Sequence, residues 1–187
     1  HIHFEYRDSK SVPLNPLIMA YDLEDQIKPI AKELALIPLS QNALINTSPL
    51  MQTIPLFRDK SGIYHFADTI SVFGEFGLAI KAIDKREGTN NIYQFHKAEL
   101  IVDGELEFEI SYDRIPFNQG KFAKTLIEFN LERQNLGEFQ KLYRLPEHKK
   151  TSIHKSENLG ILGLAPGTHS VLINIFDAYG NKTMVKG

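Results

Sequence analysis

The chain of 187 residues contains no cysteine and no tryptophan, and it has no long apolar run. The lack of cysteine excludes a disulfide framework and leaves the redox compartment open. A membrane-spanning helix needs about 18 or more consecutive apolar residues, so we expect no transmembrane segment in this chain. The net charge of -2 gives no electrostatic reason to bind nucleic acid. The composition therefore predicts a folded globular chain with an ordinary hydrophobic core.

Short alternating segments bounded by Gly, Pro, Asn or Asp follow one another along most of the chain and predict β-strands. Asp103-Gly104 lies between two of them and indicates a tight hairpin, because both residues tolerate positive φ. A second turn requires a left-handed residue at Gly180. Strands are expected at 2–7, 33–39, 50–57, 62–66, 69–73, 78–83, 95–102, 105–112, 137–145 and 168–187.

Many short strands with turns between them predict a mainly β chain, most simply an immunoglobulin-like β-sandwich preceded by a terminal strand. The Cys-Trp-Cys core of antibody domains is absent, so the term describes architecture only. Residues 77–91 and 169–182 share a pattern of alternating strand, aspartate and glycine-containing turn, which predicts equivalent hairpins of one sandwich or of two subdomains. For residues 121–134, a helix and a long strand both fit the pattern.

The chain begins HIHFEYRDSKSVPLNPL, in which His1, His3 and Glu5 share one face of a predicted strand. Two imidazoles at this spacing point the same way, so one could bind a metal while the other stands over a bound water. A catalytic zinc needs about three protein ligands, however, so the pair alone is not a site. By spacing alone, the simplest interpretation is an exposed strand end or the remnant of a tag.

The whole string resembles the last motif of the M23 (LytM, lysostaphin-type) zinc metallopeptidases, which has His-x-His-Phe-Glu, a hydrophobic residue, Arg, a short turn and then Asn-Pro. The resemblance implies that His3 is a zinc ligand and that His1 is a catalytic histidine acting on the water. The rest of the chain resembles, less specifically, the immunoglobulin-like domain that follows the peptidase in Bacteroidetes-type members. The family's other two ligands, in an upstream H-x(3)-D motif, have no counterpart in this sequence.

The prolines of residues 8–16 predict a loop with a boundary at Asn15-Pro16, and residues 18–32 are expected to form a linker with a helical turn near 23–27. The resemblance implies that residues 1–17 end a peptidase domain and that 33–187 form an accessory sandwich. The expected function is that of the C-terminal accessory region of a zinc metalloendopeptidase acting on peptidoglycan peptide cross-links. Its expected location is the periplasm or outer envelope of a Gram-negative bacterium. We expect this chain alone to be inactive and not to bind zinc tightly, since affinity needs several fixed ligands.

Two other functions fit the sequence. The sandwich could itself be a non-catalytic adaptor that binds an envelope protein, through edge strands or the phenylalanine-rich stretch 73–80. Alternatively, a terminal His1 with a second histidine resembles the copper-binding histidine brace of lytic polysaccharide monooxygenases. That site would require a second histidine from a distant loop near His1.

Other polar residues carry weaker signals. Asp84, Asp103 and Asp177 could bind calcium, but no EF-hand pattern is present, and hydrogen bonding within turns is the expected role. The remaining histidines have no spacing suited to zinc and are expected to be strand or surface residues rather than ligands. They are His65, His96, His148, His154 and His169.

Overall fold

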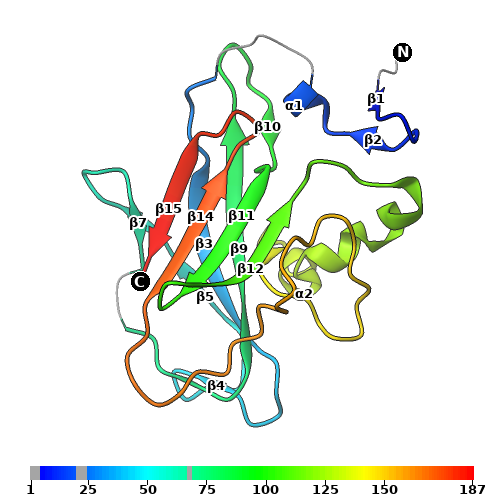
Figure 1. Cartoon of the computed structure of the whole chain (residues 1–187). Coiled ribbons are helices and arrows are strands. Elements are labelled where there is room, and N and C mark those ends of the chain that lie inside the picture. Colours follow the sequence, from blue (N-terminus) through cyan, green and yellow to red (C-terminus); the bar gives the residue numbers. More distant parts are fainter. Residues whose placement is uncertain (1–4, 20–24, 67–68) are drawn as a thin grey trace.

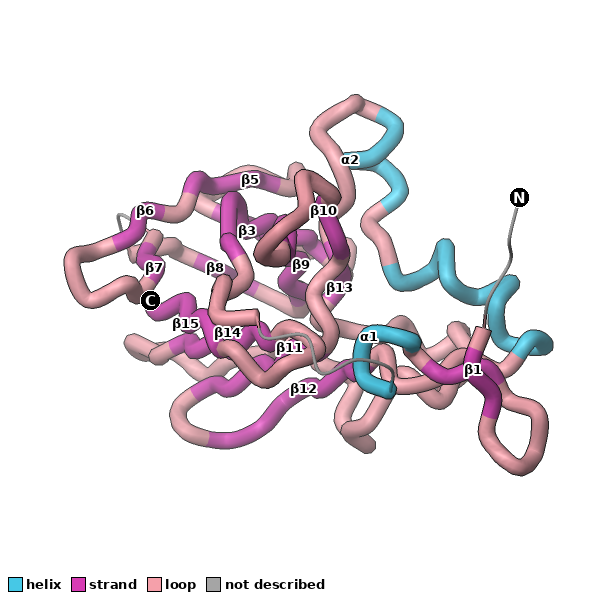
Figure 2. The backbone as a smooth tube through the Cα atoms, turned by 90° about the horizontal axis from the view of Figure 1, so that it is seen from above, coloured by secondary structure: helices cyan, strands magenta, loops and turns pink. Residues whose placement is uncertain are grey.

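The computed structural model describes residues 5–19, 25–66 and 69–187, and its architecture is a two-sheet β-sandwich (Figures 1 and 2). The sheets form two facing layers, and the helical segments lie to one side together with the N-terminal strands (Figure 2). The prediction of a mainly β chain built as a β-sandwich is thus confirmed. The immunoglobulin-like strand order in particular stays a prediction.

One layer is an antiparallel five-stranded sheet centred on two long strands. Its order is β10-β9-β3-β5, and β13 also pairs with β9. Alternation along the long strands sends every second side chain into the sandwich, because strand side chains alternate between faces. The strands are β3 (Ile30–Pro38), β5 (Gln52–Pro55), β9 (Phe76–Lys85), β10 (Ile92–Tyr93) and β13 (Gln140–Lys141).

The other layer is a six-stranded sheet in the order β12-β11-β14-β15-β7-β6, antiparallel except where β15 pairs with β7. The predicted hairpin at Asp103-Gly104 is confirmed, since both residues have positive φ, 52° and 89°. The turn between β14 and β15 has Gly180 at φ 88°, also as predicted. The strands are β6 (Phe57–Arg58), β7 (Tyr64–His65), β11 (Lys97–Val102), β12 (Glu105–Ser111), β14 (Val171–Phe176) and β15 (Lys182–Lys186).

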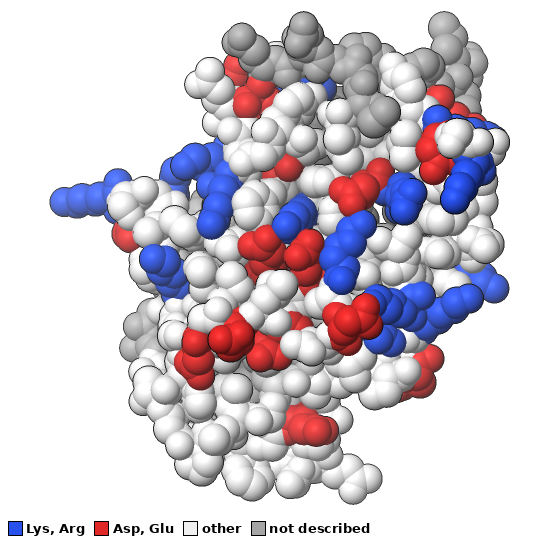
Figure 3. All heavy atoms as spheres, viewed as in Figure 1, with Lys and Arg blue, Asp and Glu red and all other residues white. Residues whose placement is uncertain are grey.

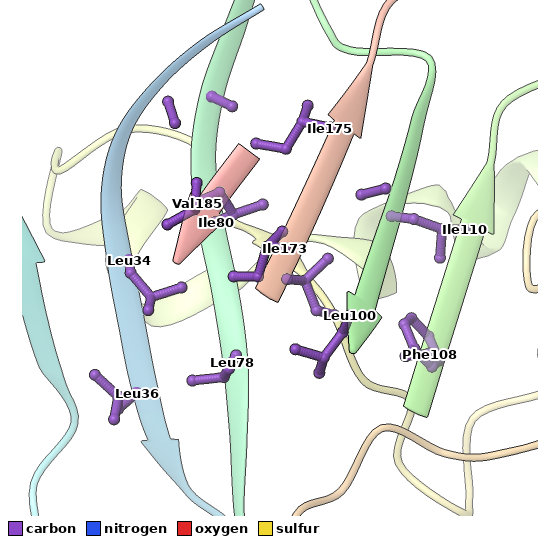
Figure 4. Packing of buried hydrophobic residues seen from close by; sticks show 14 of the residues in the cluster. Leu34, Leu36, Leu78, Ile80, Leu100, Phe108, Ile110, Ile173, Ile175 and Val185 are labelled. Carbon is purple, nitrogen blue, oxygen red and sulfur yellow. The ribbon is translucent and has the colours of Figure 1, made fainter. Parts of the chain in front are cut away.

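Apolar side chains from the two sheets meet in one core (Figure 4). Leu34, Leu78 and Ile80 come from the five-stranded sheet and pack against side chains such as Leu100 and Ile173 from the six-stranded sheet. All five are at most 2% exposed, so each contributes about 1.5–3 kcal/mol by leaving water. This shared core makes the two sheets one unit.

The solvent face of the six-stranded sheet is charged rather than apolar, with Lys, Arg, Asp and Glu interleaved (Figure 3). Lys97 on β11 lies 2.8 Å from Glu99 and 3.3 Å from Glu109 on β12. Pairs of this kind at a sheet surface contribute about 1 kcal/mol or less each, but they keep the face hydrated.

Two helical segments separated by residues 127 and 128 lie within residues 117–133, and they decide the alternative that the sequence left open for residues 121–134 in favour of helix. A 3-10 helix, η1, spans Phe117–Leu126, and α2 follows at Phe129–Arg133. Glu128 begins α2 by accepting a hydrogen bond from the backbone N–H of Asn130. Leu131 of α2 packs with Phe139 and Tyr143 on the outer face of the five-stranded sheet, in a second apolar cluster.

Two small antiparallel pairs complete the described strands: β1 (Tyr6–Arg7) with β2 (Pro13–Leu14), and β4 (Leu44–Ile45) with β8 (Val72–Phe73). The segment 8–16 was expected to be all loop, and β2 corrects this. Pro13 is tolerated in β2 because a proline at an edge needs no donor. A short helix, α1, spans Pro16–Met19.

Some predicted boundaries shift. The helical turn expected near 23–27 falls partly outside the described residues, and residues 25–27 are not helical. Strand β3 begins at Ile30, inside the range expected to be linker, while the strand expected at 137–145 is reduced to β13. Within the described part of the chain, no helix is long and apolar enough to cross a bilayer.

Candidate functional site

The two histidines of the predicted zinc site, His1 and His3, lie outside the described residues. Their roles as catalytic residue and metal ligand therefore stay predictions, as does the copper-binding alternative at His1. The described part of the opening string begins at Glu5, whose carboxylate accepts a hydrogen bond from the Nε of Arg7 at 2.9 Å. The Arg7 guanidinium also lies 5.2 Å from the ring centre of Phe117, which ties β1 to η1.

Asp8 closes the hairpin between β1 and β2. Its Oδ1 accepts hydrogen bonds from the backbone N–H groups of Lys10 at 2.8 Å and Val12 at 2.9 Å. The hydrogen bond from Val12 is the main cause that lowers the pKa of Asp8 below its usual value. Ser11 takes a left-handed conformation with φ 60° to complete the turn. The short turn that the peptidase resemblance requires is thus formed by local hydrogen bonds.

Asn15 fastens residues 5–19, which we call the N-terminal arm, to the end of β12. Its backbone N–H donates to the carbonyl of Asp113 at 2.8 Å, and its side-chain Nδ2 donates to the carbonyl of Tyr112 at 3.1 Å. Its side-chain oxygen accepts from the N–H of Leu17 at 3.0 Å and so starts α1. We call this set of contacts the Asn15 junction.

A histidine supports the Asn15 junction from within the sandwich. His96 Nδ1 lies 3.4 Å from Asn15 Nδ2, and His96 Nε2 lies 3.0 Å from Asp113 Oδ1. Burial lowers the pKa of His96, which favours the neutral ring. The tautomer that satisfies both contacts carries its proton on Nε2, donates it to Asp113 and accepts from Asn15 at Nδ1.

Ser111, His96 and Asp113 lie together, but their arrangement is not that of a nucleophilic triad. In a triad the serine and the aspartate contact opposite ring nitrogens. Here both lie on the Nε2 side, at 3.4 Å for Ser111 and 3.0 Å for Asp113. The Ser111 hydroxyl donates instead to Asp113 Oδ1 at 2.7 Å, and Lys155 pairs with Oδ2 at 2.7 Å. The group is therefore structural.

An open groove of about 330 Å³ lies beside the Asn15 junction. Apolar and aromatic side chains dominate its wall, and Glu138 is its single carboxylate. Glu138 accepts a hydrogen bond from the side chain of Gln94 at 2.6 Å. Histidine, serine and cysteine are missing from its lining, so the polar side chains that the groove offers are Glu138, two tyrosines and three amides.

Three buried carboxylates converge at the end of the sandwich where β9 and β14 finish, and we call them the aspartate cluster. Asp84 is on the inner face of β9, Asp177 directly follows β14, and Asp25 precedes β3. One carboxylate oxygen from each residue lies within 4.8 Å of those of the other two. Among residues 5–19, 25–66 and 69–187, no other set of three histidine or acidic side chains lies close enough to share a metal.

The hydrogen bonds of the aspartate cluster are unevenly distributed. Asp177 Oδ1 accepts from the N–H groups of Tyr179 and Asn181, both at 2.8 Å, and Asp177 Oδ2 accepts from the side chain of Asn181 at 2.7 Å. By contrast, one oxygen of Asp25 and one of Asp84 are buried without a hydrogen-bond partner. No ion pair between described residues neutralises any of the three carboxylates.

Burial and the neighbouring negative charges have a clear effect on the pKa of Asp84. Burial raises its pKa to about 7, with the neighbouring Asp177 and Asp25 adding to the effect. A carboxylate in a water-poor site beside like charges favours its neutral form. When no cation is bound, the cluster therefore holds a proton near neutral pH.

The sequence indicated part of this cluster. Asp84 and Asp177 occupy matching positions in the two similar segments, and these segments form the hairpins β9–β10 and β14–β15 on opposite sheets of one sandwich. The expected turn role is confirmed for Asp177 but is wrong for Asp84, which faces the core. Asp25 was not expected, because it lies in the predicted linker and no pattern links it to the other two.

The fold thus defines a mainly β protein with a two-sheet sandwich, a helical flank and a docked N-terminal arm. Comparison with family models, with curated proteins and with solved structures gives no match for this chain. The functional argument therefore rests on its own residues.

Proposed function

We propose that this chain is the C-terminal accessory region of a cell-envelope zinc metalloendopeptidase that cleaves the peptide cross-links of peptidoglycan. The proposal combines the M23-like string at the N-terminus with the Asn15 junction. In this proposal the sandwich holds the catalytic domain in a fixed orientation, and the enzyme works in the periplasm or outer envelope of a Gram-negative bacterium. The chain by itself is inactive.

The observation that carries the proposal is the docking of the string's own Asn-Pro step. Asn15 makes its hydrogen bonds to the end of β12 at the position where the peptidase resemblance ends. Leu14 also bridges to Arg114, and Asp8 lies 3.7 Å from the Arg114 guanidinium. Several contacts thus restrain the N-terminal arm. The chain that leads into the arm at Glu5 therefore has a defined direction relative to the sandwich.

The zinc chemistry needs residues beyond those of this chain. His3 supplies one of the roughly three ligands of a catalytic zinc, so the donor set present here does not fit a complete site. Zinc in the complete enzyme would polarise the scissile carbonyl and lower the pKa of its bound water. His1 would then assist proton transfer, which is a role that neutral imidazole can fill near pH 7.

The test uses the full-length protein, including the sequence that precedes His1. Metal analysis should find one zinc per chain, and cross-linked muropeptides should be cleaved. His3→Ala should lose the zinc and lower the cleavage rate at least a hundredfold. His65→Ala is the matched control, because His65 is a half-exposed histidine on another short strand. Full activity in His3→Ala would refute the assignment.

A non-catalytic adaptor is the second candidate, and one observation favours it. Leu44 and Phe73 are cross-strand partners of β4 and β8, and they are 36% and 62% exposed. The phenylalanine-rich stretch is therefore divided, because Phe76 is buried in the core while Phe73 faces solvent. If the folded full-length protein binds no zinc and cleaves nothing, the adaptor function replaces the peptidase one.

A further inference from the structure

We propose that the aspartate cluster is a calcium-binding site that ties the segment before β3 to both sheets of the sandwich. This inference goes beyond the proposed peptidase function and does not depend on it. The zinc site would use the histidines of the opening string, whereas this site uses oxygen atoms at the upper end of the sandwich in Figure 1.

The three carboxylates come from three separate parts of the chain. Asp25 precedes β3, Asp84 lies on the inner face of β9 near its end, and Asp177 directly follows β14. β9 belongs to the five-stranded sheet and β14 to the six-stranded sheet. Local turn formation cannot account for this convergence, because the three residues are far apart in sequence and belong to different layers.

Two carboxylate oxygens of the aspartate cluster are buried and unsatisfied. Asp25 is 8% exposed and Asp84 is 5% exposed, and each has one buried carboxylate oxygen without a hydrogen-bond partner. Buried polar atoms in native proteins nearly always have a partner, and a bound ion is a common partner of those that lack a protein one. A buried carboxylate without a partner is costly, and a cation between the three would satisfy both orphaned oxygens at once.

Hydrogen bonds around Asp177 preorganise the aspartate cluster. The Asn181 side chain donates to Asp177 Oδ2 at 2.7 Å and to the backbone carbonyl of Asp25 at 2.8 Å. Thr183 on β15 donates through its hydroxyl to the carbonyl of Pro29 at 2.5 Å. These bonds hold the 25–29 segment against the β14–β15 hairpin, so the carboxylates are positioned before any ion binds.

The donor chemistry selects calcium over other metals. The cluster offers carboxylate oxygens and no histidine or cysteine, whereas zinc and copper prefer nitrogen and sulfur ligands. Calcium takes six to eight oxygen ligands in flexible geometry, so water molecules can complete a set of three carboxylates. Magnesium requires near-ideal octahedral geometry at shorter metal–oxygen distances, which three carboxylates held by separate segments of the chain match less well.

The experiment uses the whole chain after removal of metal with EDTA and exchange into metal-free buffer. Calorimetric titration with CaCl₂ should show about one binding site per chain. The thermal unfolding temperature should rise by about 5–10 °C when the calcium concentration is about a hundred times its Kd. MgCl₂ and ZnCl₂ are titrated in parallel, and each should give at least a tenfold weaker effect.

Two isosteric variants test the ligands. Asp84→Asn and Asp25→Asn should each weaken calcium binding at least tenfold while their circular dichroism spectra stay native. Asp103→Asn is the matched control, because Asp103 is also an aspartate beside a strand end but is exposed and hydrogen-bonds to His169 and Ser170. It should bind calcium like the unmodified chain.

Two results would overturn the proposal. One is a folded, unmodified chain that shows neither heat of binding nor thermal stabilisation at 5 mM calcium. In that case protons shared between the carboxylates, rather than a metal ion, would neutralise the cluster. The other is calcium binding that persists unchanged in both Asp84→Asn and Asp25→Asn, which would place the ion elsewhere. Because neither outcome involves zinc or muropeptides, failure here is distinct from failure of the peptidase proposal.

Discussion

In the metal-free protein at pH 8, Asp84 is a buried anion next to two other carboxylates, and Asp84→Asn should therefore stabilise the fold. The substitution keeps the shape of the side chain and removes its charge. The protein should become more stable in EDTA and at the same time lose its response to calcium. A residue with only a packing role would show neither effect.

The size of the gain follows from the pKa of Asp84, which is raised from 3.8 to about 7. At about 1.36 kcal/mol for each pH unit, this rise corresponds to about 4 kcal/mol of stability. The contribution is fully present below pH 3.8 and is lost as the pH rises through about 7, because the folded state binds the proton more tightly than the unfolded state. An asparagine amide with imperfect hydrogen bonds costs about 1–2 kcal/mol, so the expected net gain at pH 8 is about 2 kcal/mol.

Urea denaturation of both proteins in EDTA at pH 5 and pH 8 measures this gain. The unmodified chain should lose stability between the two values relative to Asp84→Asn, so that the difference between the proteins is larger at pH 8. Comparison of the two proteins cancels the titration of groups that do not interact with Asp84. The electrostatic reasoning would be refuted if the two proteins had equal stability at both pH 5 and pH 8, or if Asp84→Asn were the less stable protein at pH 8.

Three other predictions concern different parts of the molecule. Gly77→Ala should lower the free energy of unfolding by about 1–3 kcal/mol in urea denaturation, because the new Cβ would lie 2.5 Å from the buried ring of Tyr143. Asn15→Ala should speed amide exchange in residues 5–19 by about fivefold with little change elsewhere, because loss of a hydrogen bond worth about 1 kcal/mol releases the N-terminal arm locally. His169 should titrate above its usual pKa in NMR spectra because it is hydrogen-bonded to Asp103, and Asp103→Asn should bring that pKa down.

Each of these has its own control or contrary result. Gly120→Ala should be nearly neutral, since no atom lies within 4 Å of the Cβ it would add. For Asn15, unchanged exchange in the arm would show that the hydrogen bonds of the Asn15 junction do not restrain it. Because the pKa of His169 is raised in the folded state, its protonated form stabilises the fold at low pH, and this contribution is lost as the pH rises through the pKa of the folded state. A pKa at or below 6.5 would exclude the ion pair.

The strand pattern was predictable because its causes are local. Alternation of polar and apolar residues marked β9 and β11, and Asp103-Gly104 marked the hairpin, since both signals depend on neighbouring residues alone. The helical segments were not decided by sequence, because residues 121–134 fit both periods. Packing of Leu131 against the outer face of the five-stranded sheet settled them.

The chemical signals divide in the same way. The opening string and its peptidase resemblance come from sequence alone, and they remain a hypothesis because His1 and His3 lie outside the described residues. Sequence also marked Asn15-Pro16 as a boundary, but it did not reveal that Asn15 binds the backbone of Tyr112 and Asp113. That contact joins residues almost a hundred positions apart, and no local pattern encodes it.

The sequence by itself therefore determined the alternating strands, the positive-φ turns, and the matching aspartates that follow β14 and end β9. Each of these depends on the conformation of a few adjacent residues. The tertiary structure alone decided that Asp84 and Asp177 face each other across two sheets and that Asp25 joins them. Burial and mutual repulsion of these carboxylates are properties of the packed sandwich, because in the unfolded chain each carboxylate is separately hydrated and has an ordinary pKa.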